Sequence, residues 1–394
     1  MNAEVIYTAA HADFPDTEPL GGGKAVADWL IAAWHREELF PFTILSPNSL
    51  DFTLSKPLTQ MNEFEYARFC REFERAATRK ILGRDSNRCV VLSNDICEGP
   101  DFEVLSKRGF RVVSIFHVDV VEFFTKFYLR GVVRAETAAK FHAFNLLPDM
   151  LRLVFEKQHD CVRHSARIVV PSEPMRATIL RCYPWCDPQK IVVLPWGNIA
   201  EHSDALPEIA PYPVSEDEFV IMTLSRLSPE KGIERLLAAL PQVESRDLKL
   251  RVFICGAPAY MKGHAYERKL RRLAANVTNA RVEFTGHITG GLKASLLHRA
   301  DLFVSTSRHE SYGLTIEEAR ATGCRVISHR HYGASGVIVD CADTHAFAAA
   351  ISAAIAAGRT QRESTGTHRS DAAQKLAELL LEVAVFTSPA CPAV

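Results

Sequence analysis

The chain has 394 residues, of which 47% are hydrophobic and 24% charged, and its formal net charge is −1. This composition is typical of a globular protein with an ordinary core, and the length favours two domains over one. A chain so close to neutrality lacks the basic balance of a nucleic-acid-binding domain, so no nucleic acid is expected as a partner.

The ten cysteines are scattered, and only Cys182 and Cys186 stand close together. Without a second pair at a metal-like spacing, reduced and mostly buried thiols are expected, which favours a cytoplasmic location. The first residues, MNAEVIYTAA, lack the basic and apolar regions of a signal peptide. No run reaches the roughly 18 apolar residues of a transmembrane helix. Peripheral contact with the inner face of a membrane stays open.

Short β-branched runs alternate with segments of helical period in the first half of the chain, which predicts a parallel sheet covered by helices. The expected strands are residues 5–9, 42–46, 89–93, 111–117, 167–171 and 191–194. The expected helices are residues 24–37, 62–82, 101–107, 120–129, 145–164 and 174–182.

The second half repeats this plan after a proline-bearing segment without periodicity. Its expected strands are residues 219–224, 250–255, 282–284, 302–305, 325–328 and 336–339. Its expected helices are residues 231–243, 266–276, 290–299, 314–322 and 344–357. We therefore predict a first domain at 1–197, a linker at 198–218 and a second domain at 219–358. Residues 359–394 are predicted to hold a mobile loop, a helix at 372–385 and a loose tail.

Two such doubly wound domains would face each other across a cleft, with ligands bound beyond the carboxyl ends of the strands. After the first strand, Gly21 to Gly23 precede a helix, and their backbone suits an anion as well as a simple flexible turn. The fourth strand ends in His117, which suits a sugar hydroxyl or a proton transfer, although a purely structural histidine is the simpler interpretation.

Two cations follow the first strand of the second half. Arg226 and Lys231 are five residues apart across a turn that Pro229 helps to fix. A planar guanidinium fork and a flexible ammonium group can converge on one diphosphate. Two solvated surface cations are the alternative, and the position after a strand favours phosphate binding.

The stretch at 302–329 reads as strand, loop, helix and strand, with Glu310 and Glu318 eight residues apart. Tyr312, Gly313 and Leu314 lie between them, and a helix that begins near Leu314 would let both carboxylates approach one ligand. Glycine permits close approach of the backbone, and the helix start offers N–H groups. Glu317 or Glu318 alone is more simply explained as an acidic residue in the first turn of an ordinary surface helix.

The helix at 62–82 carries basic residues interleaved with phenylalanines, a pattern that suits an anionic lipid surface or an acidic acceptor. Acidic residues intervene, so a solvated face with internal ion pairs is favoured. The segment 120–130 offers aromatic surface for an apolar or lipid-linked acceptor, and buried packing explains it equally well.

The segments TLSRLSPEKGIERLLAAL and HESYGLTIEEARATGCRVIS together resemble the retaining, nucleotide-sugar-dependent glycosyltransferases of family 4, which have the GT-B fold. The second segment is similar to the E-x7-E signature of that family, and the resemblance covers most of the second half. The first half is a weaker match.

The resemblance implies a role for each matching residue. Arg226 and Lys231 would hold the donor diphosphate and stabilise the departing nucleotide. Glu310 would contact hydroxyls of the transferred sugar, and Glu318 would accept hydrogen bonds from the ribose. Backbone groups of Tyr312, Gly313 and Leu314 would support sugar or phosphate, and the backbone of Ile288 would meet the base. Gly22 and Gly23 would close over the phosphates, and His117 would meet the sugar hydroxyls.

The implied donor is a nucleoside-diphosphate sugar of the UDP or GDP type, and the acceptor is an unassigned hydroxyl of a glycan, lipid or small molecule. No cofactor or metal is implied, since Arg226 with Lys231 can do the work of a divalent ion. The chain departs from the family at Trp196, at Ser311 and in the loop 329–336, and no closing helix that returns to the first domain is evident. A GT-B hydrolase, a phosphorylase or a non-catalytic sugar-binding protein are the alternatives.

Overall fold

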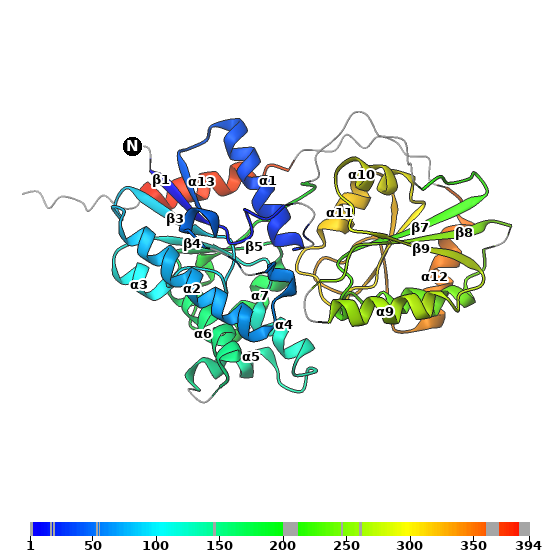
Figure 1. Cartoon of the computed structure of the whole chain (residues 1–394), viewed down its shortest axis with the longest axis horizontal. Coiled ribbons are helices and arrows are strands. Elements are labelled where there is room, and N and C mark those ends of the chain that lie inside the picture. Colours follow the sequence, from blue (N-terminus) through cyan, green and yellow to red (C-terminus); the bar gives the residue numbers. More distant parts are fainter. Residues whose placement is uncertain are drawn as a thin grey trace, which may run out of the picture. The chain divides into compact units, whose positions relative to one another are not determined.

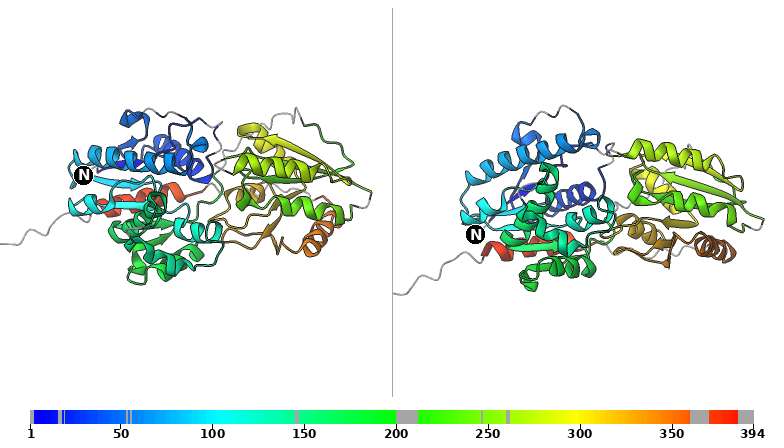
Figure 2. Two further views of the ribbon diagram at one scale, coloured as in Figure 1. Left: turned by 60° about the horizontal axis from the view of Figure 1, so that its bottom comes forward. Right: turned by 90° about the horizontal axis from the view of Figure 1, so that it is seen from below.

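A computed structural model describes the chain except for residues 1–2, 16–17, 19, 53, 55, 145–146, 200–211, 246, 260–261, 360–369 and 386–394. The chain divides into two compact units (Figures 1 and 2). Unit 1 comprises Met1–Phe14, Gly22–Trp196 and Asp371–Val394, and unit 2 comprises Pro15–Gly21 and Gly197–Ser370. Most of the predicted linker and of the predicted mobile loop after residue 358 lies outside the described residues.

Unit 1 is built on a six-stranded sheet in which every described pairing is parallel. The strand order is β2-β1-β3-β4-β5-β6. The strands are β1 (Glu4–Thr8), β2 (Phe42–Leu45), β3 (Cys89–Ser93), β4 (Val112–Ile115), β5 (Arg167–Val170) and β6 (Ile191–Val193). The helices are α1 (Gly22–Glu37), α2 (Glu63–Leu82), α3 (Phe102–Lys107), α4 (Val120–Phe127), α5 (Ala135–Ala138), α6 (Asp149–His164), α7 (Glu173–Cys182) and α13 (Ala372–Val385).

Unit 2 repeats the architecture with the order β12-β11-β10-β7-β8-β9, again parallel throughout. Its strands are β7 (Glu218–Leu224), β8 (Lys249–Cys255), β9 (Ala280–Gly286), β10 (Leu302–Ser305), β11 (Arg325–His329) and β12 (Val337–Val339). Its helices are α8 (Glu234–Ala239), α9 (Gly263–Ala274), α10 (Gly290–Arg299), α11 (Leu314–Ala321) and α12 (Thr344–Ala356). Two doubly wound parallel sheets, as predicted from the sequence, are confirmed.

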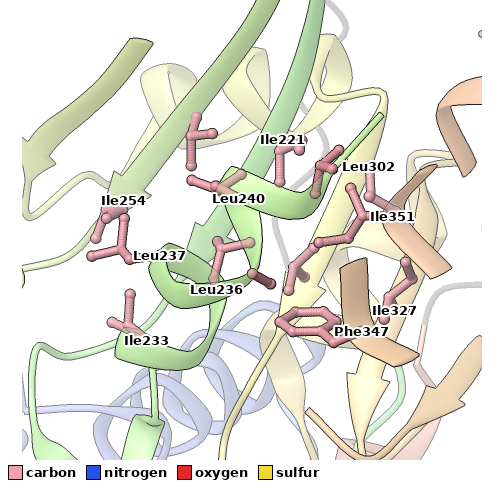
Figure 3. Packing of buried hydrophobic residues seen from close by; sticks show 14 of the residues in the cluster. Ile221, Ile233, Leu236, Leu237, Leu240, Ile254, Leu302, Ile327, Phe347 and Ile351 are labelled. Atoms are coloured by element: carbon pink, nitrogen blue, oxygen red, sulfur yellow. The ribbon is translucent and has the colours of Figure 1, made fainter. Parts of the chain in front are cut away.

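The core of unit 2 has two layers because helices cover both faces of its sheet. Figure 3 shows the layer in which α8 and α12 pack on the strands, with Leu236 and Leu237 from α8 and Phe347 and Ile351 from α12. A second cluster lies under α10 and α11 and includes Ile316. Continuous apolar strands are what burial on both faces requires.

The last described helix, α13, has the bounds 372–385 that were predicted from the sequence. A closing helix that returns to the first domain was not evident from the sequence, yet α13 belongs to unit 1 and lies beside α1 (Figure 1). The indole N–H of Trp34 donates to the carbonyl of Ala373 (3.1 Å), and Arg111 donates to the carbonyl of Val383 (2.5 Å). Residues 371–385 are thus an integral part of unit 1.

Two further differences concern the connection between β4 and β5. The helix expected at 145–164 begins at Asp149, because Pro148 takes the position before the first turn. The short helices α5 and η3 (Ala139–Ala143) were not expected. No helix among the described residues is long and apolar enough to cross a membrane.

Candidate functional site

Parallel sheets bind ligands where the strand order reverses, because the loops on either side of that point diverge. In unit 2 the chain runs from β7 outward to β9, then returns to β10 and continues outward on the other side. The reversal therefore lies between β7 and β10. The loops after these strands and after β11 meet at one edge of the sheet, and they carry Arg226, Lys231 and Glu310.

The loop after β7 is fixed against the loop after β10. Gly232 has φ 61°, and a Cβ at this position would lie 2.6 Å from the carbonyl oxygen of Thr306, so only glycine fits. The Thr306 hydroxyl donates to the carbonyl of Lys231 (2.9 Å), and the Arg308 N–H donates to the carbonyl of Glu230 (2.8 Å). These contacts set the position of the Lys231 side chain.

Lys231 and Glu310 form an ion pair at the centre of this site. Lys231 Nζ lies 2.6 Å from Glu310 Oε1, and the Ser307 hydroxyl donates to the same oxygen (2.7 Å). Burial alone would raise the pKa of the Glu310 carboxyl, but Lys231 and Ser307 outweigh it and lower that pKa to about 2. The site therefore holds a fixed negative and a fixed positive charge side by side.

Arg226 belongs to the same turn as Lys231. Its Nη2 lies 3.7 Å from Glu230 Oε1, and its side chain is about a quarter exposed. Ser228 also donates a hydrogen bond to Glu230. Arg226 is thus held at the rim of the turn by Glu230.

Glu318 lies on α11 and does not join the Lys231–Glu310 pair. Its Oε1 lies 2.9 Å from Lys293 Nζ of α10, and the residue is 8% exposed. The second oxygen, Oε2, is buried and has no hydrogen-bond partner among the described residues. A buried acceptor without a partner is costly unless a ligand supplies a donor.

The turn before α11 and the loop after β11 pack on each other. Gly313 has φ 85°, and a Cβ at Gly333 would lie 1.9 Å from the carbonyl oxygen of Tyr312. The Tyr312 hydroxyl accepts a hydrogen bond from the N–H of Gly197 (2.7 Å). The backbone conformation of the turn from Tyr312 to Leu314 thus depends on two glycines. The side chain of Ile288 is buried in the core.

His331, in the loop after β11, was not among the residues predicted from the sequence. Both of its ring nitrogens are buried and lack a hydrogen-bond partner among the described residues. Burial lowers the pKa of its imidazole to about 4, an effect that Glu310 opposes and Lys231 strengthens. His331 is therefore a neutral imidazole beside the Lys231–Glu310 pair, and it offers one donor and one acceptor. The signal in the sequence was its position after a predicted strand.

The predicted first-half residues lie at the equivalent edge of unit 1, where the strand order reverses between β1 and β3. Gly22 and Gly23 form the first turn of α1, and a Cβ at Gly23 would lie 3.4 Å from both Asp95 and His117. His117 donates from Nε2 to Asn94 Oδ1 (3.1 Å). Burial lowers the pKa of His117, although Asp95 opposes this.

A charged cluster beside His117 was also missed by sequence reasoning. His11 Nδ1 lies 3.5 Å from Asp95 Oδ2, and His11 Nε2 lies 3.6 Å from Glu98 Oε1. Burial alone would lower the pKa of His11, but the two carboxylates raise it to about 9. His11 follows β1, and Asp95 with Glu98 follows β3. The search for polar residues just after each predicted strand, which singled out His117, would also have found these three.

Within the residues that the structure describes, no three His, Cys, Asp or Glu side chains are grouped so as to hold a metal ion. The nine described cysteines are buried and unbridged.

Comparison with solved structures places the architecture among GT-B proteins. A trehalose 6-phosphate synthase from Burkholderia multivorans aligns over 98% of this chain and 100% of its own, with a TM-score of 0.68 and 13% identity. Anabaena HepE, solved in complex with UDP and glucose, aligns over 97% and 96% with a TM-score of 0.57 and 16% identity. At such identities the likeness concerns the fold.

Residues 207–368 match the family model described as glycosyl transferases group 1. Among curated relatives, the D-inositol 3-phosphate glycosyltransferase of Geodermatophilus obscurus is 31% identical over 199 residues, which are 46% of this chain and 44% of that protein. The alignments span less than half the length of the curated relatives that are matched first: 28%, 44% and 35%.

Proposed function

We propose that this protein is a retaining glycosyltransferase, which moves a sugar from a nucleoside-diphosphate sugar of the UDP or GDP type to a hydroxyl acceptor without a metal ion. The observation that carries the proposal is the Lys231–Glu310 ion pair, 2.6 Å long, at the reversal point of the unit 2 sheet. The match of residues 207–368 to the glycosyltransferase family model supports it.

Arg226 and Lys231 bind the donor diphosphate. During transfer, the bond between the anomeric carbon and the phosphate oxygen breaks, and negative charge accumulates on the departing nucleoside diphosphate. Two cations held in one turn stabilise that charge without having to reorganise. This is the electrostatic task that a divalent cation performs in other enzymes.

Glu310, Glu318 and His331 recognise the two ends of the donor. Glu310 is ionised, so it accepts hydrogen bonds from sugar hydroxyls. His331 donates to one hydroxyl and accepts from another, which satisfies both of its buried nitrogens. The Oε2 atom of Glu318 accepts a hydrogen bond from a ribose hydroxyl, and this bond offsets the free-energy cost of burying Oε2 without a partner. Backbone groups of Ile288 and of the turn from Tyr312 to Leu314 complete the donor contacts.

Unit 1 supplies the acceptor side in this proposal. Gly22 and Gly23 contact the phosphates, and His117 contacts hydroxyls of the transferred sugar. Asp95 and Glu98 offer carboxylate oxygens to acceptor hydroxyls. The new bond joins the acceptor oxygen to the anomeric carbon on the face from which the phosphate leaves, and the hydroxyl proton is released with the nucleoside diphosphate. The printed name of the Geodermatophilus relative, which acts on D-inositol 3-phosphate, supports a polyhydroxyl acceptor.

Two experiments test the function. Calorimetric titration with UDP and with GDP measures nucleotide binding, and a panel of radiolabelled donors, including UDP-glucose, UDP-N-acetylglucosamine and GDP-mannose, measures transfer to pooled hydroxyl acceptors. We expect micromolar binding of one nucleotide and labelled product from its sugar. Binding without turnover would favour a non-catalytic sugar-binding protein. Release of free sugar in the absence of acceptor would favour a hydrolase, and release of sugar phosphate with inorganic phosphate would favour a phosphorylase.

A further inference from the structure

The connection between β4 and β5 is much longer than a parallel crossover requires. One helix is sufficient to join two parallel strands, yet residues 116–166 contain α4, α5, η3 and α6. Only α6 among these packs with α2 and α3 over the sheet. The shorter elements α4, α5 and η3 project as a layer of their own at the edge of unit 1 (Figures 1 and 2).

This layer exposes large apolar side chains. Tyr128 is 44% exposed, Val132 85%, Phe144 58% and the adjoining Trp185 50%. They are four of the nine large hydrophobic side chains that are exposed in the described part of the chain. Such a concentration marks an interaction site, whereas scattered exposed residues would need no explanation.

Two separate series of ring contacts start from η3, one reaching Phe144 and the other Trp185. The rings of Phe141 and Phe144 lie 5.7 Å apart, and both belong to or adjoin η3. From the same element, His142 stacks on His159 of α6 at 3.7 Å, and His159 lies 5.5 Å from Trp185. The exposed rings of Phe144 and Trp185 are thus both linked to η3, and together with Tyr128 and Val132 they form what we name the α4–α5 surface.

The charge of the α4–α5 surface is positive on balance. Residues 120–144 contain four cations and two acids. Glu122 is paired with Lys126 (2.9 Å), and Glu136 is bound by Arg181 of α7 (3.2 Å). The guanidinium of Arg163 lies 5.8 Å from the Trp185 ring centre. The four cations of the segment are all exposed: Lys126, Arg130, Arg134 and Lys140.

The basic helix α2 is different, although its sequence suggested a similar role. The helix contains five cations and four acids, and two of the cations are paired: Arg68 lies 2.8 Å from Glu72, and Arg71 lies 2.8 Å from Glu156. Phe64 is exposed but stands between Glu63 and Glu65. The pattern of α2 is therefore that of an ordinary solvated helix.

We propose that the α4–α5 surface binds the face of an anionic lipid bilayer. Aromatic and apolar side chains ringed by Lys and Arg are the composition that sits at the boundary of headgroups and acyl chains. Each cation near an anionic surface raises the partition coefficient about fivefold. A second copy of the chain fits poorly, because a twofold contact would set the same cations against each other. This proposal does not depend on the proposed glycosyl transfer.

The experiment is flotation of the whole chain with vesicles of phosphatidylcholine alone and of phosphatidylcholine with 30% phosphatidylglycerol. We expect the protein to float with the anionic vesicles, to remain unbound with the neutral ones, and to be released as salt rises from 50 to 500 mM. The double variant Arg130→Glu with Arg134→Glu and the single variant Val132→Asp should each lower binding at least about tenfold.

The matched control on α2 is Phe64→Asp with Arg68→Glu, which should leave binding unchanged. All substituted side chains are exposed, so circular dichroism and thermal melting should show intact folds. Absence of binding to anionic vesicles, equal binding to neutral vesicles, or equal loss in the α2 control would each overturn the proposal. So would loss of a dimer by size-exclusion chromatography in the α4–α5 variants, which would make the surface a contact between copies.

Discussion

Lys231 and Glu310 are 79 positions apart in the sequence, and their side chains form an ion pair. The carboxylate is buried, so its charge depends on the ammonium group beside it, and the ammonium is held in turn by the loop contact between Gly232 and Thr306. Removing either member leaves an uncompensated buried charge.

Substitution of the cations should weaken nucleotide binding. Lys231→Ala and Arg226→Ala each remove a charge-assisted contact worth about 1.5 to 3 kcal/mol, so the affinity for UDP or GDP should fall roughly ten- to a hundredfold. Calorimetric titration measures this. Lys269→Ala, on the exposed surface of α9, is the control. Unchanged affinity in both site variants would show that this turn does not bind the diphosphate.

Glu310→Gln should separate chemistry from nucleotide binding. The amide keeps the shape of the side chain but loses the charge that faces the sugar, so transfer rate should fall much more than affinity for the free nucleotide. Steady-state kinetics with titration of the nucleotide gives both values. Equal losses in the two would place Glu310 outside the sugar site.

His331→Ala should distinguish the sugar from the nucleotide in a similar way. Two neutral hydrogen bonds to hydroxyls are worth about 1 kcal/mol each, so affinity for UDP-glucose or GDP-mannose should fall roughly five- to thirtyfold. Affinity for UDP or GDP alone should change less than about twofold, because these lack the sugar. His345→Ala, which is exposed at the start of α12, is the control. If the affinities for the nucleotide sugar and for the free nucleotide fall equally, His331 contacts the phosphates and not the sugar.

The His11 cluster makes stability depend on pH in a defined direction. The pKa of His11 in the folded protein is about 9 against an ordinary value of 6.5, so the protonated ring favours the folded state. This stabilisation is complete below pH 6.5 and is lost as pH rises from 6.5 to 9. The shift corresponds to about 3 kcal/mol at most. Urea unfolding of the wild type should show this loss, whereas His11→Gln should flatten the profile and His35→Gln should not.

At the scale of elements, strands were predictable, whereas the short helices α5 and η3 were not. The segments 89–93 and 302–305 match β3 and β10 residue for residue, because strands buried on both faces are continuous apolar runs with polar boundaries. The short α5 and η3 have no periodic face of their own, and they form because α6 and α7 pack against them. The local hydrophobic pattern of a segment does not show whether other helices will pack against it.

The packing position of α13 could not be predicted either, because an amphipathic pattern shows that a helix packs on a core but not on which one. Its Leu376 and Leu380 are fully buried in unit 1. Leu380→Ala should therefore lower the free energy of unfolding by about 2 to 5 kcal/mol. The neighbouring Leu381→Ala, which is 38% exposed, should change it by less than about 1 kcal/mol. Similar effects of the two substitutions in urea unfolding would show that α13 is not docked on unit 1.

For the whole molecule, the strand order decides where the chemistry lies. The sequence placed Arg226, Lys231 and Glu310 after strands, but only the order β11-β10-β7 makes their loops neighbours. The same applies to His11 and Asp95, 84 positions apart, which meet because β3 pairs with β1. Such long-range pairings leave no periodic trace, so the candidate donor residues were predictable from the family resemblance and their partners were not.

Hydrogen exchange across the whole chain should show where the nucleotide acts. At a hundredfold excess over its dissociation constant, UDP or GDP stabilises the bound state by about 2.7 kcal/mol. Amides that exchange by opening of the binding loops should therefore slow by up to roughly a hundredfold. We expect this slowing in residues 225–232, 306–318 and 330–336 of unit 2.

Within unit 1, the start of α1 tests the role proposed for Gly22 and Gly23. Protection there, with no change in β1, β3 or α13, would mean that the glycine turn contacts the phosphates, because the rest of the unit serves as an internal reference. No protection at α1 would confine nucleotide binding to unit 2. Uniform slowing of both sheets, without excess in the three loops, would contradict a local donor site, because only a general stabilisation of the fold acts on all amides equally.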